Sequence, residues 1–130
     1  MIALSTLLAA SAAEKGKPNI QRHYDKAGNL TEVVFYDYSV EPVQVERLTI
    51  EKDSRVRTTQ RGRLLLRRET EKYSAPGVLS DREIEWCSEG NGNIDRKTVM
   101  HYVNFKIDVV EYALREGEWK LISTTPASGL

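Results

Sequence analysis

The chain has 130 residues, of which 40% are hydrophobic and 29% charged, and this composition argues against a disordered, collagen-like or membrane-spanning protein. Its length suits a single domain with one hydrophobic core. Nineteen Lys and Arg balance nineteen Asp and Glu, so the chain as a whole lacks the excess of positive charge that marks most nucleic-acid and membrane-surface binders. The single cysteine, Cys87, excludes an intrachain disulfide and a cysteine-based zinc site built from this chain alone.

The chain begins with an uncharged apolar run, residues 2–13, followed directly by Glu14 and Lys15. This run is typical of the apolar region of a secretory signal, with Ala10-Ser11-Ala12 as the cleavage element. No Lys or Arg precedes it, so the alternative is a helix-forming segment that caps the folded domain. The run is too short to span a bilayer. We therefore expect residues 1–13 to form a separate segment and residues 14–130 a single domain, in a periplasmic or secreted protein, or otherwise in a cytoplasmic one.

Prolines and most glycines separate the apolar stretches, as breakers do between β-strands. Within the stretches Val, Ile, Thr, Tyr, Phe and Trp are frequent, which favours strands over helices. The expected extended segments are 19–25, 30–40, 43–51, 55–60, 63–73, 78–88, 94–115 and 118–124. This spacing predicts an all-β antiparallel meander of eight or nine strands, closed into a small barrel or folded into a sandwich.

Residues 99–114, within the expected segment 94–115, are ambiguous between strand and helix. Positions 99, 101, 103, 105, 107 and 109 alternate as in a strand, whereas positions 100, 103, 107, 110 and 114 fit helical spacing. The β-branched residues favour a strand. Because the apolar positions change parity at Val109-Val110, we expect a long strand with a β-bulge or a bend there, and a second bulge between Val45 and Leu48.

The strongest local feature is an arginine-rich hairpin around Gly62. Residues 55–68 contain six arginines and no acidic residue: Arg55, Arg57, Arg61, Arg63, Arg67 and Arg68. Pairing of the two strands would gather several guanidinium groups into one patch suited to phosphate or carboxylate. The alternative is that these arginines pair with carboxylates on neighbouring strands, which would leave a solvated face with little binding energy. The candidate partners are Glu46, Glu51, Glu69, Glu71, Glu83 and Glu85.

Histidine and cysteine are the candidates for chemistry, and none of them lies in a recognised motif. His23 lies at a strand end, His101 is expected to be buried among valines, and Cys87 is expected to be a buried thiol. Two isolated histidines and one cysteine do not show the spacing of a metal site, and no phosphate-binding loop is present. Trp86 and Trp119 are expected to anchor the core. The sequence therefore predicts no metal and no cofactor.

Residues 23–33, His-Tyr-Asp-Lys-Ala-Gly-Asn-Leu-Thr-Glu-Val, resemble a single YD repeat of the Rhs and teneurin shells. Those shells require many copies, and the pattern occurs once in this chain. The resemblance is one of hairpin chemistry, in which a tyrosine pairs across a Gly-Asn turn. We carry no function over from it.

These observations predict a non-catalytic binding or interaction module that uses a barrel interior or the arginine-rich hairpin, for an unknown acidic partner or a small ligand. The first alternative is a protein that binds phosphate or nucleic acid through Arg55 to Arg68, although residues 55–68 contain no aromatic side chain for stacking single-stranded bases. The second alternative is a small enzyme that uses His23, His101 or Cys87.

Overall fold

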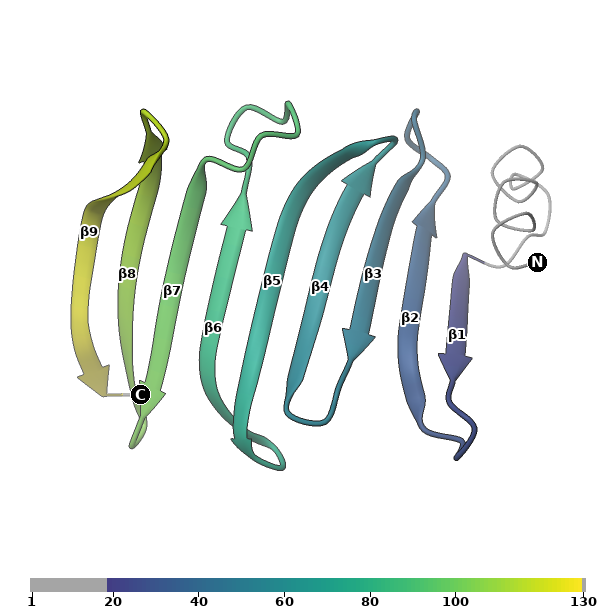
Figure 1. Ribbon diagram of the computed structural model, residues 1–130, viewed down its shortest axis with the longest axis horizontal. Helices are drawn as coiled ribbons and strands as arrows, with labels where there is room; N and C mark the ends of the chain where they lie inside the picture. The colour runs from purple at the N-terminus through teal and green to yellow at the C-terminus, as the bar shows by residue number, and fades with distance from the viewer. Residues whose placement is uncertain (1–18, 130) are drawn as a thin grey trace.

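The computed structural model describes residues 19–129, and the side chains of residues 19–125. They form one antiparallel sheet in which each strand pairs with its neighbours in the chain (Figure 1). The strands are β1 (Ile20–Tyr24), β2 (Leu30–Asp37), β3 (Gln44–Ile50), β4 (Ser54–Arg61), β5 (Leu64–Ala75), β6 (Val78–Trp86), β7 (Arg96–Val103), β8 (Lys106–Arg115) and β9 (Glu118–Gly129). The predicted all-β antiparallel meander is confirmed, with nine strands.

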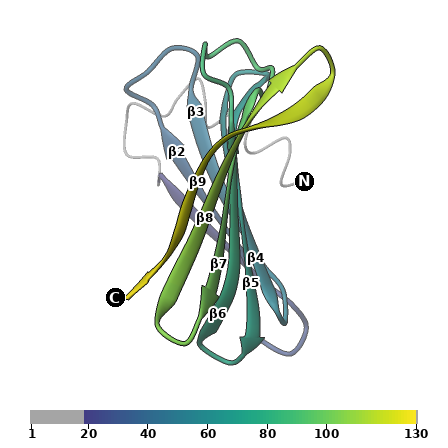
Figure 2. The same ribbon diagram turned by 90° about the vertical axis from the view of Figure 1, so that its left-hand side faces the viewer.

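The predicted closure into a barrel is wrong, because the sheet is open. β1 and β9 are its two edges and do not pair with each other. In Figure 2, which turns the molecule by 90°, the strands lie in one twisted layer. The described strands therefore make neither a closed barrel nor two packed sheets. Local alternation of residues could not reveal this, because a strand has the same repeat of two in a barrel, a sandwich and a single sheet.

The expectations for residues 1–13, a cleaved signal or a capping helix, lie outside the described residues. Within residues 19–129, no helix has the length and apolar character needed to cross a membrane.

The segment 94–115 is a hairpin and not one long bent strand. β7 and β8 pair in register from Arg96↔Ala113 to Val103↔Lys106, around a turn at Asn104 and Phe105. Both turn residues have positive φ, 50° for Asn104 and 64° for Phe105. No glycine or proline marks this turn, so the breaker pattern could not predict it. The one feature of the sequence that could have indicated a turn here is Asn104, because asparagine tolerates the left-handed region of backbone conformation.

The predicted bulge between Val45 and Leu48 is absent, because β3 pairs with β2 and β4 without a register shift. At Val109-Val110 the β7–β8 ladder has no shift, but the β8–β9 ladder shifts between Ile107 and Val109, where the extra residue lies on β9 and not on β8. The change of apolar parity has another cause: Val45 and Leu48 lie on opposite faces, and both faces of the sheet carry apolar side chains. Register shifts occur instead in the β1–β2, β4–β5, β5–β6 and β8–β9 ladders.

Few described residues are fully buried, and partly buried residues occur on both faces of the sheet. Every residue of β3 is half-buried, without the alternation of a strand that covers a core on one side. The buried hydrophobic residues are Val33, Val34, Tyr36, Cys87 and Ala113. Val33 and Val34 are consecutive, so they face opposite sides of the sheet. Because no second layer covers either face in the described part, the stems of long polar side chains shield the apolar residues between them.

We expect that replacing Phe105 by glycine stabilises the protein by about 0.5–1 kcal/mol, because a bulky residue is unfavourable in the left-handed conformation. Phe105 is 86% exposed, so the substitution removes almost no packing. It also creates Asn-Gly, the preferred sequence of a two-residue hairpin turn. The measurement is the urea midpoint of unfolding. Phe105→Ala is the control, since alanine keeps the Cβ atom; equal midpoints for the two variants would refute the explanation.

Candidate functional site

One face of the sheet gathers arginines from strands that are far apart in the sequence. Strand pairing places residues in rows across the sheet, and directly paired residues share a face. One row is Arg22, Val33, Leu48, Arg57, Glu69, Ile84, Thr98, Glu111 and Ser123. The row on one side of it is Ile20, Phe35, Glu46, Thr59, Arg67, Trp86, Arg96, Ala113 and Lys120. The row on its other side is Ile50, Arg55, Glu71, Arg82, Met100, Val109 and Thr125. We call the face that carries these three rows the arginine face.

The arginine face is positive although the whole chain is neutral. Its three rows hold seven basic side chains and four carboxylates, an excess of three positive charges. The basic residues are Arg22, Arg55, Arg57, Arg67, Arg82, Arg96 and Lys120, and the acidic residues are Glu46, Glu69, Glu71 and Glu111. The side chains of Arg57 and Arg67 are 40% and 39% exposed, so both guanidinium groups can reach a ligand in solution.

An ion-pair network crosses the centre of the arginine face. The carboxylate of Glu69 lies 3.0 Å from Arg67 Nη1 and 3.2 Å from Arg82 Nε, and Glu69 is 8% exposed. Arg82 also donates a 2.6 Å hydrogen bond to Glu71. Burial opposes ionisation of Glu71, but the hydrogen bonds from Arg82 and Tyr73 hold its pKa below the usual value. The network fixes the central arginines and neutralises part of their charge.

The six arginines predicted as a patch are divided between the two faces. Arg55, Arg57 and Arg67 lie on the arginine face, and Arg68 lies on the opposite face, where its guanidinium is 3.4 Å from Glu85. Of the other two, Arg61 ends β4, where it pairs with Gln44 and donates a hydrogen bond to it, and Arg63 lies in the β4–β5 turn; both are exposed. The register shift in the β4–β5 ladder between Thr59 and Gln60 adds one residue on β5, so the residues of β5 before and after the shift cannot be assigned to a face by simple alternation.

The alternative that arginines pair with carboxylates on neighbouring strands holds for two of the six, Arg57 and Arg68, whereas Arg67 pairs with Glu69 on its own strand, β5. Arg57 is 3.4 Å from Glu46, and Arg67 and Arg68 have the partners given above. Arg55 has no carboxylate within ion-pair distance among the described residues; its guanidinium lies over the ring of Tyr73, 5.5 Å from the centroid. Pairing therefore reduces the charge of the hairpin without removing it.

Sequence reasoning missed the arginines of the other strands and the aromatic residues among them. Arg82 and Arg96 come from β6 and β7, and Trp86 lies between Arg67 and Arg96 in one row. The guanidinium of Arg82 lies 6.0 Å from the ring centroid of Tyr102. Alternation along β6 is enough to place Arg82 and Trp86 on one face. Only the register of β6 with β5 and β7 shows which arginines lie beside them.

The structure does not bring the histidines and the cysteine together. His23 is in β1, 3.7 Å from Glu32, whereas His101 is in β7, 2.7 Å from Asp81. Six strand spacings separate β1 from β7, about 30 Å. His101 is exposed, so its expected burial is wrong, and its hydrogen bond lowers the pKa of Asp81. Cys87 is buried as expected, and its thiol points to the carbonyls of Leu65 and Leu66.

The two tryptophans are half-buried and do not anchor a closed core. Trp86 lies on the arginine face and Trp119 near the β9 edge on the opposite face. The Nζ atom of Lys97 lies 4.5 Å from the Trp119 ring centroid.

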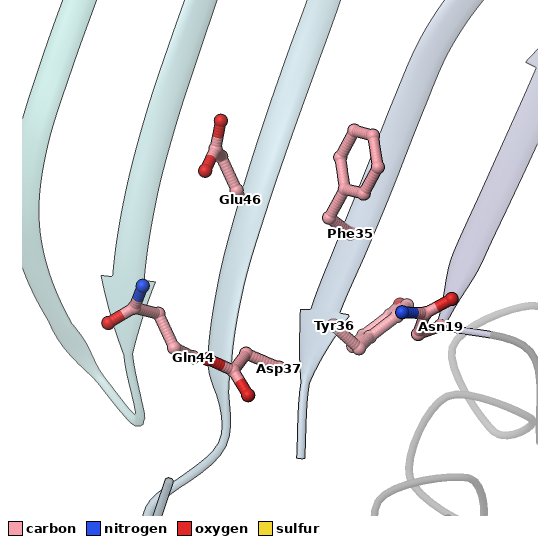
Figure 3. Close-up of a pocket in the computed structure, with 6 residues that line it drawn as sticks. All are labelled: Asn19, Phe35, Tyr36, Asp37, Gln44 and Glu46. Atoms are coloured by element: carbon pink, nitrogen blue, oxygen red, sulfur yellow. The ribbon is translucent and has the colours of Figure 1, made fainter. Parts of the chain in front are cut away.

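The described surface has several shallow hollows, of which three are well formed. One of about 260 Å³ adjoins the β2–β3 end and is lined by Asn19, Phe35, Tyr36, Asp37, Gln44 and Glu46 (Figure 3). A second, of about 330 Å³, lies over β5–β7 and includes Lys72, Asp81 and Val99. A third, of about 730 Å³, lies between the β3–β4 and β5–β6 turns and includes Arg55 and Tyr73. None of the three is the enclosed interior that the predicted barrel would have supplied.

The described residues contain no group of three or more His, Cys, Asp and Glu side chains placed to hold a metal ion. Comparison with known proteins finds no matching family model, no matching curated protein and no matching solved structure. The fold and the site define the class: an all-β protein whose described part is one open antiparallel sheet with an arginine-rich face.

Proposed function

We propose that this chain is a non-catalytic interaction module that binds an acidic partner on the arginine face. The observation that carries the proposal is the excess of three positive charges on one face of a neutral chain. Arginine suits this role because its planar guanidinium group donates paired hydrogen bonds to a carboxylate or a phosphate.

An open sheet supports this mode of binding. Without a second layer over the described strands, the arginine face meets solvent over β4 to β7 and offers a wide, nearly continuous surface. Arg57, Arg67 and Arg82 are held in place by Glu46, Glu69 and Glu71, so less side-chain entropy is lost when a partner binds. A guanidinium with one carboxylate partner still has donors to spare for a second.

The test compares matched pairs of arginine substitutions on the two faces. Arg55→Ser with Arg96→Ser removes two charges from the arginine face without removing a partner of Glu69, and Arg47→Ser with Arg68→Ser removes two from the opposite face. We expect the first pair to weaken binding of a fluorescent polyglutamate peptide about tenfold at low salt, since each exposed charge contact contributes up to about 1 kcal/mol. The control pair should change binding by much less.

Salt titration provides the second measurement. Binding through the arginine face should weaken steadily with added NaCl, because exposed charges are screened. Equal losses for both pairs of variants would show that binding follows total charge and not this face, and no retention of the native protein on heparin or polyglutamate would overturn the proposal.

A further inference from the structure

We infer that the arginine face binds single-stranded nucleic acid, with a base stacked on Trp86 and the flanking phosphates held by Arg67 and Arg96. This inference rests on the proposed function, because it names the class of acidic partner that the same face takes. Judged from the sequence alone, the lack of aromatic side chains in residues 55–68 argues against binding of single-stranded nucleic acid. The folded sheet removes that objection by adding aromatic residues from other strands.

The geometry of one row carries the inference. Arg67, Trp86 and Arg96 stand directly opposite one another on β5, β6 and β7. Adjacent strands are about 4.8 Å apart, so the two arginines flank the indole about 10 Å from each other. A basic surface with an aromatic platform is the combination that binds single strands, since the base stacks while the backbone phosphates meet the cations.

Trp86 is half-buried on the arginine face, so part of the residue is exposed to solvent. Among residues 19–125, no cation lies over it and no other ring contacts it, whereas Lys97 lies over the ring of Trp119. Arg96 is 33% exposed, and its carboxylate contact, to Asp95, is 3.9 Å long. Arg67 is held by Glu69 at 3.0 Å and keeps further donors for a phosphate.

Two further aromatic residues have an arginine of this face over their rings, Arg82 over Tyr102 and Arg55 over Tyr73, so Trp86 is the ring proposed for stacking. An acidic peptide would use the arginines and leave the indole unused. A duplex would present phosphates while its bases stay stacked on each other. A single strand is the polyanion that uses both kinds of side chain.

The two tryptophans provide the test, because they lie on opposite faces. Oligo-dT of about twelve nucleotides, within the usual range of site sizes, is titrated into the native protein, Trp86→Phe and Trp119→Phe, and indole fluorescence is recorded. We expect quenching in the native protein and in Trp119→Phe, and almost none in Trp86→Phe. Trp86→Ala should weaken binding measured by fluorescence anisotropy about tenfold, and Trp86→Tyr should restore most of it.

The outcomes separate this inference from the proposed function. Binding of oligo-dT without quenching of Trp86, or equal affinity for oligo-dT, its duplex with oligo-dA and inorganic polyphosphate, would overturn the stacking role while the acidic-partner proposal stands. Binding of polyglutamate but not of oligo-dT would point to an acidic protein as the partner. Circular dichroism of each variant shows whether the sheet is intact, and Trp86→Phe is the variant that keeps an aromatic ring if Trp86→Ala fails to fold.

Discussion

Replacing Val34 by aspartate is expected to unfold the protein, and replacing it by alanine to lower the free energy of unfolding by about 2 kcal/mol. Val34 is 1% exposed and is the largest side chain that is fully buried in the described residues. Gln21 and Arg47 flank it in the neighbouring strands. An aspartate there would place a charge among apolar atoms and the aliphatic stems of these neighbours.

The effect is large because so few residues of this sheet are fully buried. A domain has only about 5–15 kcal/mol of net stability, and a single layer should lie near the lower limit. Losing about 2 kcal/mol at one valine therefore removes a large share of the total. The measurement is urea unfolding followed by circular dichroism. Val78→Ala is the matched control, since Val78 is also a strand valine but is 51% exposed, and its midpoint should hardly move. Equal losses at the two valines would contradict the burial described here.

Replacing Glu69 by glutamine is expected to have two effects of opposite sign. The free energy of unfolding should fall by about 1–3 kcal/mol, because Arg67 and Arg82 lose the charged partner that lies buried between them. Binding of the same polyanion probes should tighten about threefold at low salt, because the arginine face gains one net positive charge.

Glu46→Gln is the matched control for this second prediction. Glu46 lies on the same face and pairs with Arg57 at 3.4 Å, but its side chain is 44% exposed. The change in charge is the same, so polyanion binding should tighten by a similar factor, while stability should change by at most about 1 kcal/mol. Chemical denaturation and anisotropy titration of both variants check the two effects separately. Weaker polyanion binding by Glu69→Gln, with the fold intact, would contradict the assignment of the binding face.

Most of the strand layout could be predicted from the sequence, because turn residues act locally. Lys26 to Asn29 and the glycines at 62 and 77 require or favour turns, and strands lie between them. The exception is the turn at Asn104 and Phe105. Its second residue is bulky and apolar, so a local rule favours continuing the strand, and only the pairing of β7 with β8 compensates for the unfavourable backbone.

The candidate site was only partly visible in the sequence. A segment with six arginines among fourteen residues is obvious in the sequence, and Arg55, Arg57 and Arg67 do share a face. Arg63, which was predicted to belong to the same patch, lies in the β4–β5 turn instead. Arg82, Trp86 and Arg96 could not be joined to the hairpin, because their position beside Arg67 depends on the register of β5 with β6 and of β6 with β7.

The amino-acid sequence by itself determined the all-β class, the position of most turns and a neutral chain with one arginine-rich segment, because strand propensity and turn chemistry are properties of a few adjacent residues. The tertiary structure alone decided that the sheet stays open and that β4 to β7 place arginines and aromatic residues on a common face. The physical reason is that ladder register joins side chains that are distant in the chain, and a shift of one residue would move each of them to the other face.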